Sequence, residues 1–207
     1  IAIVGPSGAG KTTLAHILSQ AKTPTKGSIS FNKEATRIGF LSQNPYIFSA
    51  SIKDNIAMFK KVDDDQILHV LEMVGLKEKV MSLKNGIHSR IGEGGEMLSG
   101  GQMRRIELSR VLLMNPDIVV FDEPTTGLHE DDLPILIECF NHLIDQGNTV
   151  ILIEHNLTMM TQADWFIDIG PYAGDKGGQL LYSGEPQGLL DVEQSVTAKH
   201  LRRYIEQ

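Results

Sequence analysis

The segment at residues 5–12, with the sequence GPSGAGKT, constrains this chain more than any other part of it. It matches the pattern G-x-x-x-x-G-K-[ST] at every fixed position, between an expected strand at residues 1–4 and an expected helix at residues 11–20. A glycine-rich turn in that setting points successive backbone N–H groups inward and can hold anionic oxygens. A plain glycine-rich turn is the alternative, but the lysine, the hydroxyl and the strand together favour a phosphate-binding loop.

The residue types in this loop suit the phosphates of a nucleotide and a divalent cation. Lys11 can reach the terminal phosphates, and the hydroxyl of Thr12 can bind Mg²⁺. The N-terminus of the following helix adds a partial positive charge that favours anions. The residues that we expect to hold the nucleotide are Gly5, Pro6, Ser7, Gly8, Ala9, Gly10, Lys11, Thr12 and Thr13.

The composition is that of a globular domain. The chain has 207 residues, of which 41% are hydrophobic, and this suits one domain or one core with an inserted lobe. A formal net charge of -7 argues against a nucleic-acid groove spread over the whole surface. The single cysteine, Cys139, permits neither an internal disulfide nor a zinc site built on cysteine pairs, and we expect a buried, inert thiol.

The apolar runs of the chain are too short to span a bilayer, and no signal peptide precedes the first expected strand. We therefore expect no direct insertion into a membrane and a cytoplasmic location.

Strand patterns and helix patterns alternate along the chain. This order predicts an α/β fold with a mostly parallel sheet flanked by helices on both faces. We expect residues 1–48 and 116–207 to form the nucleotide-binding core, and residues 49–115 to form an inserted helical subdomain. Helices are expected at residues 103–114 and 133–146. A further helix is expected to follow a cap at Asp63, and another is expected in the tail from residue 193. Further strands are expected at residues 28–31, 38–41, 118–121, 149–153, 165–169 and 179–183.

Polar residues follow two of these expected strands. Asp122 and Glu123 come after the strand at residues 118–121, and His155 follows the strand at residues 149–153. Open α/β sheets bind ligands at the C-terminal ends of their strands, where the phosphate-binding loop also lies. Phosphoryl transfer to water needs a cation and a group that orients the water, and Asp122 and Glu123 are placed for these two tasks. An idle acidic pair at a strand end is the alternative.

The pentapeptide LSGGQ at residues 98–102 precedes an expected helix. A serine and two glycines at a helix start make a second anion-binding surface. Because one chain needs only one phosphate cradle, this surface suggests a nucleotide held by a partner. A capped helix without a ligand is the alternative.

The motifs, and their order along the chain, resemble those of the ATP-binding-cassette (ABC) ATPases. Residues 5–12 resemble the Walker A motif, residues 118–123 the Walker B motif, and residues 98–102 the signature motif. The resemblance implies that Gln43 is the Q-loop glutamine and that His155 is the switch histidine that contacts the γ-phosphate. It also implies a P-loop NTPase fold, with the first strands of a full ABC domain missing before residue 1, and ATP and Mg²⁺ as cofactors.

The resemblance assigns roles to single residues. It implies that the residues acting in ATP hydrolysis are Lys11, Gln43, Glu123 and His155, and that the Mg²⁺ ligands are Thr12, Gln43 and Asp122. It further implies a head-to-tail dimer in which the signature motif of one ABC domain completes the nucleotide site of the other. The signature residues that would do so are Ser99, Gly100, Gly101 and Gln102. In exporters of the family, a transmembrane domain is a further partner.

The two parts of the chain resemble different branches of the family. Residues 1–120 are similar to the nucleotide-binding domain of exporters, and they most resemble the type linked to cytochrome bd assembly. Residues 122–207 are similar to the excinuclease A subunit of nucleotide excision repair. One hypothesis is a recombined chain, a chimera joined near residues 121–125, with little or no activity as one outcome. A natural, divergent ABC protein is the other hypothesis.

Three departures from these branches qualify the resemblance. His129 stands near the place where exporters usually carry the aspartate of the D-loop. The aromatic residue that stacks on adenine in exporters is missing, so we expect weak affinity for the base. The excinuclease carries zinc-bearing insertions that touch DNA, and one cysteine leaves no room for them. An exporter-type ATPase is therefore the leading hypothesis, a DNA-repair ATPase is the alternative, and we do not expect DNA as a partner for this chain.

Overall fold

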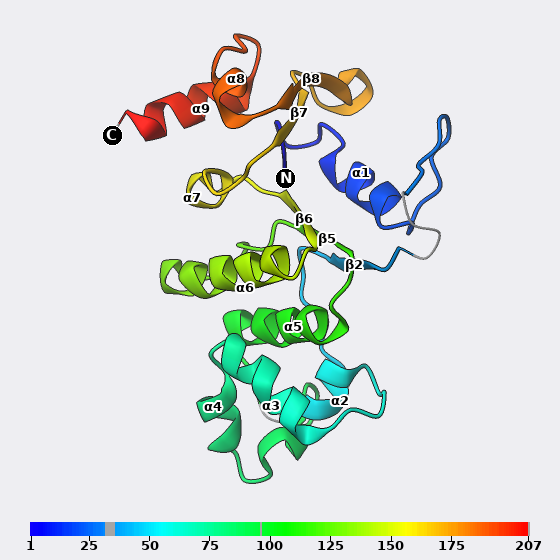
Figure 1. Ribbon diagram of the computed structural model, residues 1–207, viewed down its shortest axis with the longest axis vertical. Helices are drawn as coiled ribbons and strands as arrows, with labels where there is room; N and C mark the ends of the chain where they lie inside the picture. The colour runs from blue at the N-terminus through cyan, green and yellow to red at the C-terminus, as the bar shows by residue number, and fades with distance from the viewer. Residues whose placement is uncertain (32–35, 96, 207) are drawn as a thin grey trace. The chain divides into compact units, whose positions relative to one another are not determined.

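The computed structural model describes residues 1–31, 36–95 and 97–206 (Figure 1). Its contacts divide the chain into two units. The first unit comprises Ile1–Phe40, Ile118–Thr125 and Thr149–Gln207, and the second comprises Leu41–Asp117 and Thr126–Asn148. No helix in the described ranges combines the length and the apolar character needed to cross a membrane.

A six-stranded sheet in the order β2-β5-β6-β1-β7-β8 organises the nucleotide-binding part of the chain. Strand β1 pairs in parallel with β6 and β7, β5 pairs in parallel with β6, and β8 is an antiparallel edge strand beside β7. The expected α/β fold with a mostly parallel sheet is therefore confirmed. The strands are β1 (Ala2–Val4), β2 (Ile38–Leu41), β5 (Ile118–Asp122), β6 (Thr149–Ile153), β7 (Phe166–Gly170) and β8 (Gln179–Gly184).

The helices of the first unit cover this sheet on both faces, so β1 is buried along its whole length. Successive side chains of a strand point to opposite faces. Ile3 accordingly packs with Ala15 of one helix, whereas Ala2 and Val4 pack with Leu201 of another. The helices are α1 (Lys11–Leu18), α7 (Leu157–Met160), α8 (Pro186–Leu190) and α9 (Val196–Ile205), with a 3-10 turn at Gly174–Lys176.

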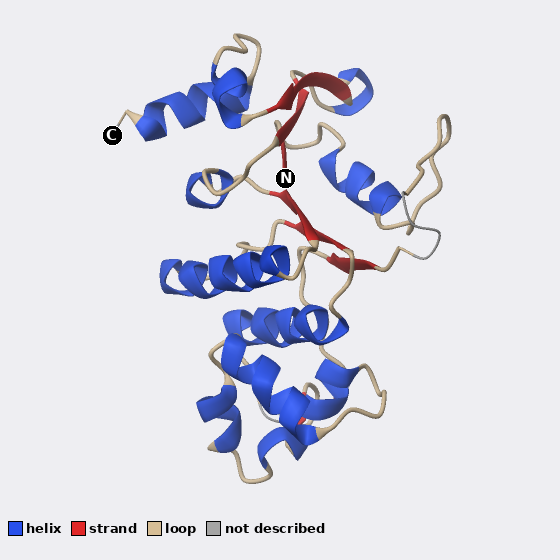
Figure 2. Ribbon diagram, in the orientation of Figure 1, coloured by secondary structure: helices blue, strands red, loops and turns tan. Residues whose placement is uncertain are grey.

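The second unit is mainly helical, as Figure 2 shows by colour. Its contacts group α6 with the other helices, whereas the sequence-based division placed that segment in the core. That division, with residues 49–115 as the inserted subdomain, stays a prediction. The elements are β3 (Ala50–Ser51), α2 (Ile52–Ala57), α3 (Asp64–Met73), α4 (Lys77–Met81), β4 (Arg90–Ile91), α5 (Gly100–Met114) and α6 (Leu133–Asp145), with 3-10 turns at Gly86–His88 and Glu130–Asp132.

The prediction of a strand at residues 28–31 is wrong. These residues follow the turn at Gly27, where φ is +84°, and Ile29 stays 38% exposed, so the segment has no buried face to hold it in a sheet. Residues 32–35 lie outside the described part of the chain. The short antiparallel pair of β3 and β4 was not expected, because two-residue strands are too short for a periodic pattern.

Candidate nucleotide site

The loop between β1 and α1 leaves the N-terminus of α1 open to an anion. Gly10 precedes the helix with a left-handed φ of +102°, and no side chain caps the first turn of α1 within the described residues. Other helices differ, since Ser51 caps α2 and Ser195 caps α9 with a side-chain oxygen. The first amides of a helix have no partner inside the helix, so those of α1 can bind phosphate oxygens.

Close contacts with β7 and with the segment that follows it hold the loop in place. Gly5 has a φ of +133°, and a Cβ there would lie 1.9 Å from the carbonyl oxygen of Ile169. The carbonyl of Gly8 accepts a hydrogen bond from Gly174 N at 3.1 Å, and the carbonyl of Ala9 accepts one from Gly178 N at 2.9 Å. Glycine at position 5 is thus required by space as well as by backbone conformation.

Lys11 is held inside the loop. Its side chain is only 5% exposed, and its Nζ donates to the carbonyl oxygens of Gly5 and Pro6, each at 2.9 Å. Burial lowers the pKa of Lys11, while the charge of Glu123 acts to raise it. The ammonium therefore lies among the loop atoms that the motif assigns to phosphate binding.

Thr12 and Asp122, both expected to bind Mg²⁺, lie together. The hydroxyl of Thr12 donates to Oδ1 of Asp122 at 3.3 Å, although they belong to α1 and β5. Asp122 is buried, and burial raises the pKa of its carboxyl group. A hydroxyl and a carboxylate are hard oxygen ligands of the kind that Mg²⁺ prefers, and Mg²⁺ sites usually add substrate phosphates and water. The described residues contain no group of three or more His, Cys, Asp or Glu side chains that could hold a metal alone. These two residues fit a Mg²⁺ site shared with a nucleotide.

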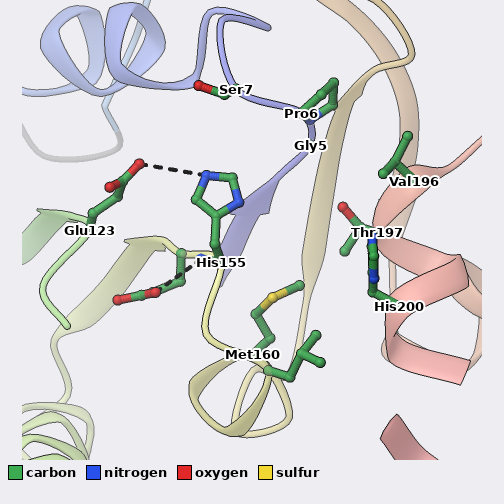
Figure 3. Close-up of a pocket in the computed structure, with 11 residues that line it drawn as sticks. Gly5, Pro6, Ser7, Glu123, His155, Met160, Val196, Thr197 and His200 are labelled. Carbon is green, nitrogen blue, oxygen red and sulfur yellow. Dashed lines mark hydrogen bonds and ion pairs between the residues drawn. The ribbon is translucent and has the colours of Figure 1, made fainter. Parts of the chain in front are cut away.

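Glu123 and His155 are brought together by the register of two strands. Asp122 of β5 pairs with Ile153 of β6, so the residues that follow leave the sheet at the same level. Nε2 of His155 lies 3.5 Å from Oε1 of Glu123 (Figure 3). Glu123 has a φ of +47°, which is unusual for a residue with a side chain, and its N–H donates to the carbonyl of Ile153 at 2.9 Å.

A pocket of about 480 Å³ adjoins this pair, a size in the range of small-molecule sites. The phosphate-binding loop forms one side of the pocket and α9 forms another, as Figure 3 shows. Sequence reasoning expected a helical tail but no part for it in the site. The lining residues are Gly5, Pro6, Ser7, Glu123, Glu154, His155, Leu157, Met160, Val196, Thr197 and His200.

A family profile described as "ABC transporter" matches residues 1–126. The chain belongs to this family. The family, the fold and the presence of an ABC-type ATPase domain, all expected from the sequence, are confirmed.

Known ABC proteins of two kinds are similar to this chain. It is 33% identical, over 92% of its length, to the ATP-dependent lipid A-core flippase of Francisella novicida, of which it covers 33%. It is 41% identical, over 63% of its length, to the UvrABC system protein A of Aquifex aeolicus, of which it covers 15%. A bacterial Atm1-family ABC exporter solved with ATP bound superimposes with a TM-score of 0.82 at 27% identity, over 98% of this chain and 36% of that one. The chain thus spans about a third or less of the length of these relatives.

The ABC signature segment forms a capped helix start. Oγ of Ser99 accepts from the N–H of Gln102 at 3.2 Å, and Oε1 of Gln102 accepts from the N–H of Ser99 at 3.0 Å. This reciprocal capping agrees with the alternative interpretation of the pentapeptide. The serine hydroxyl is an acceptor in the cap, so its own hydrogen remains able to donate to a phosphate. Gly101 lies close to Asp132, whose Oδ2 would be 2.8 Å from a Cβ at that position, whereas Gly100 has more room.

The loop with Gln43 belongs to the second unit, so its part in the Mg²⁺ site stays a prediction. Within that unit, the buried guanidinium of Arg104 on α5 donates to the backbone carbonyls of Gln43 and, at 2.7 Å, Ser42. Arg104 also pairs with the carboxylate of Glu107 at 3.0 Å. Sequence reasoning missed this link between the loop of Gln43 and α5, because an arginine inside a helix has no pattern that distinguishes a buried partner from a solvated one.

Proposed function

We propose that this chain is the nucleotide-binding domain of an ABC exporter, or of a protein built from one, and that it hydrolyses Mg·ATP. The observation that supports this proposal best is the meeting of the Thr12–Asp122 contact and the Glu123–His155 pair at the strand ends beside the loop that holds Lys11. Catalysis of phosphoryl transfer is mostly positioning and electrostatic stabilisation, and these residues supply the groups needed for both.

In the proposed mechanism, the loop amides and Lys11 bind the β- and γ-phosphates. Thr12 and Asp122, together with Gln43, would hold Mg²⁺, which neutralises phosphate charge when bound. Glu123 accepts a hydrogen bond from the attacking water and aligns it with the γ-phosphorus. His155 donates its ring N–H to a γ-phosphate oxygen, and its imidazole lies beside Glu123. The site closes when Ser99 and Gly101 of a second ABC domain approach the same γ-phosphate head to tail.

The resemblance to exporters extends the proposal to location and partners. The relative from Francisella novicida is named a flippase, and the similar solved structure is an exporter with ATP bound. We therefore infer a transmembrane domain as the partner in the parent protein, with this domain at the cytoplasmic face of the membrane.

A DNA-repair ATPase is the second candidate, supported by the similarity to UvrABC system protein A. The net charge of -7 opposes it, because binding to the DNA backbone relies on clustered cations. A filter-binding titration with duplex DNA over a salt series distinguishes the two candidates. Salt-sensitive binding at micromolar protein favours the repair candidate, and absence of binding favours the exporter candidate. The recombined origin of the chain stays a hypothesis.

The test of the leading proposal is phosphate release by the purified chain with ATP and Mg²⁺, measured over a range of protein concentrations. Because two domains share each site, the rate per molecule should rise with concentration until the dimer saturates. Removal of Mg²⁺ with EDTA should stop the reaction. Nucleotide binding without any Mg²⁺-dependent release would instead support a recombined chain without activity.

A further inference from the structure

The carboxylate of Glu154 accepts hydrogen bonds from three backbone amides. Its Oε1 accepts from Thr125 N at 3.0 Å, and its Oε2 accepts from His155 N at 2.9 Å and from Asn156 N at 3.1 Å. The residue is only 3% exposed. Hydrogen bonds from amides to a carboxylate are stronger than those between neutral groups, and a buried carboxylate needs them.

These three amides belong to two different loops. Thr125 lies two residues after Glu123, in the loop that follows β5, whereas His155 and Asn156 lie in the loop that follows β6. The ladder between the strands ends at the pair of Asp122 and Ile153, followed by the hydrogen bond from Glu123 N to Ile153 O. Glu154 therefore joins the two loops where the sheet no longer does.

We propose that Glu154 is a positioning residue for the hydrolysis reaction. By holding both loops through one rigid carboxylate, it sets the separation between the carboxylate of Glu123 and the imidazole of His155, which is 3.5 Å. Glu154 acts through these two residues and does not itself touch the reacting atoms. The inference rests on the proposed function for its effect on rate, but not for its effect on the loops.

The two oxygens of Glu154 have separate partners, and a glutamine can replace only one of them. The amide oxygen of Glu154→Gln can stay with His155 and Asn156, since that side offers two donors. Its NH₂ group then faces the N–H of Thr125, and two donors cannot bond to each other. The glutamine variant should therefore release the loop of Glu123 and keep the loop of His155, whereas Glu154→Ala should release both.

The experiment compares Glu154→Gln and Glu154→Ala with wild type and with Glu185→Gln. The control makes the same chemical change at an exposed residue of the same unit. Backbone amide hydrogen exchange, followed by NMR, reports each loop without any nucleotide. In the glutamine variant, exchange at Thr125 should quicken about tenfold while His155 and Asn156 keep their protection, since one hydrogen bond is lost. In the alanine variant, all three amides should exchange faster.

Steady-state kinetics then distinguish a positioning role of Glu154 from a general loss of structure. We expect kcat to fall about tenfold in Glu154→Gln and about a hundredfold in Glu154→Ala, because small displacements of catalytic groups have large effects on rate. The dissociation constant for ATP should stay within about twofold of wild type, since Lys11 and the loop amides are untouched. Glu185→Gln should match wild type in both measurements.

Two results would overturn the inference: wild-type kcat in a folded Glu154→Gln variant, or a loss of ATP affinity that parallels the loss of kcat. If the wild-type chain itself releases no phosphate, the proposed function fails on its own. The exchange data then decide the inference, and unchanged exchange at Thr125 in the glutamine variant overturns it.

Discussion

The imidazole Nε2 of His155 lies 3.5 Å from Oε1 of Glu123, although the two residues follow different strands of the sheet. The register of β5 and β6 brings the strand ends level, and Glu123 follows β5 with a left-handed φ of +47°. Residues held in such a conformation often mark functional sites, since the surrounding structure must hold them there. The pair is therefore the place to begin testing the mechanism.

Replacing Glu123 by glutamine should nearly abolish turnover and leave ATP binding intact. Glutamine keeps the size of the side chain but is a poor acceptor for the proton of the attacking water, so we expect phosphate release to fall by about a hundredfold or more. ATP-bound dimers should accumulate and can be measured by light scattering after size-exclusion chromatography. Normal turnover in this variant would refute the role assigned to Glu123.

Replacing Lys11 by alanine should weaken nucleotide binding itself. Hydrogen bonds to charged groups contribute about 1.5–3 kcal/mol, so the dissociation constant should rise by roughly ten- to a hundredfold. A titration with a fluorescent ATP analogue measures this change. Lys22→Ala is the matched control, because Lys22 is exposed and lies after α1, and its affinity should equal that of wild type. Equal affinities for all three proteins would contradict the placement of Lys11.

Asp122 should make stability depend on pH in a defined direction. Burial raises its pKa above the ordinary value of 3.8, so the folded chain binds more protons than the unfolded chain in the interval just above 3.8. The contribution of this group to the free energy of unfolding is therefore fully present below pH 3.8 and is lost as pH rises through the raised pKa. Melting temperatures in EDTA across this interval should fall more in wild type than in Asp122→Asn. Parallel curves would show that Asp122 has no raised pKa.

Gly5 should tolerate no side chain. The Cβ of Gly5→Ala would overlap the carbonyl of Ile169 at a φ of +133°, and we expect a loss of about 3 kcal/mol in the free energy of unfolding. Gly27→Ala is the matched control, since Gly27 also has a positive φ, +84°, but no atom of the described residues lies within 4 Å of a Cβ there. It should lose only about 1 kcal/mol. Urea denaturation measures both, and similar losses would contradict the close contact at Gly5.

Cys139 should be unreactive in the folded chain. It is 2% exposed, and burial raises the pKa of its thiol to about 12. Since the thiolate is the reactive form, only about one thiol in ten thousand is ionised at pH 8. Ellman's reagent should therefore label the chain promptly in urea and only very slowly in buffer. Rapid labelling of the native chain would contradict the burial of this residue.

The elements that the sequence predicted well have local signals. The order of strands from β5 to β8, the helix after the phosphate-binding loop, and the helix end before Gly147 all follow from apolar periodicity and glycine placement. The failed strand at residues 28–31 shows the limit of such signals. A short alternating pattern becomes a strand only where a neighbouring strand and a covering layer exist, and nothing local reports either.

The candidate site likewise contains residues that the sequence predicted and residues that it did not. Motif spacing was enough to select Lys11, Thr12, Asp122, Glu123 and His155. It was not enough to find Glu154, because a glutamate beside a histidine looks the same whether it is solvated or bonded to three amides. Two glycines after β7 donate hydrogen bonds to the carbonyls of Gly8 and Ala9, and the sequence likewise did not predict these hydrogen bonds.

By itself, the sequence determined which residue types stand at the ends of which strands, because a strand, a turn and a helix start depend on neighbours a few positions away. Only the tertiary structure decided which of those residues touch. The Thr12–Asp122 and Glu123–His155 contacts depend on strand order and register, which arise from packing between segments far apart in the chain.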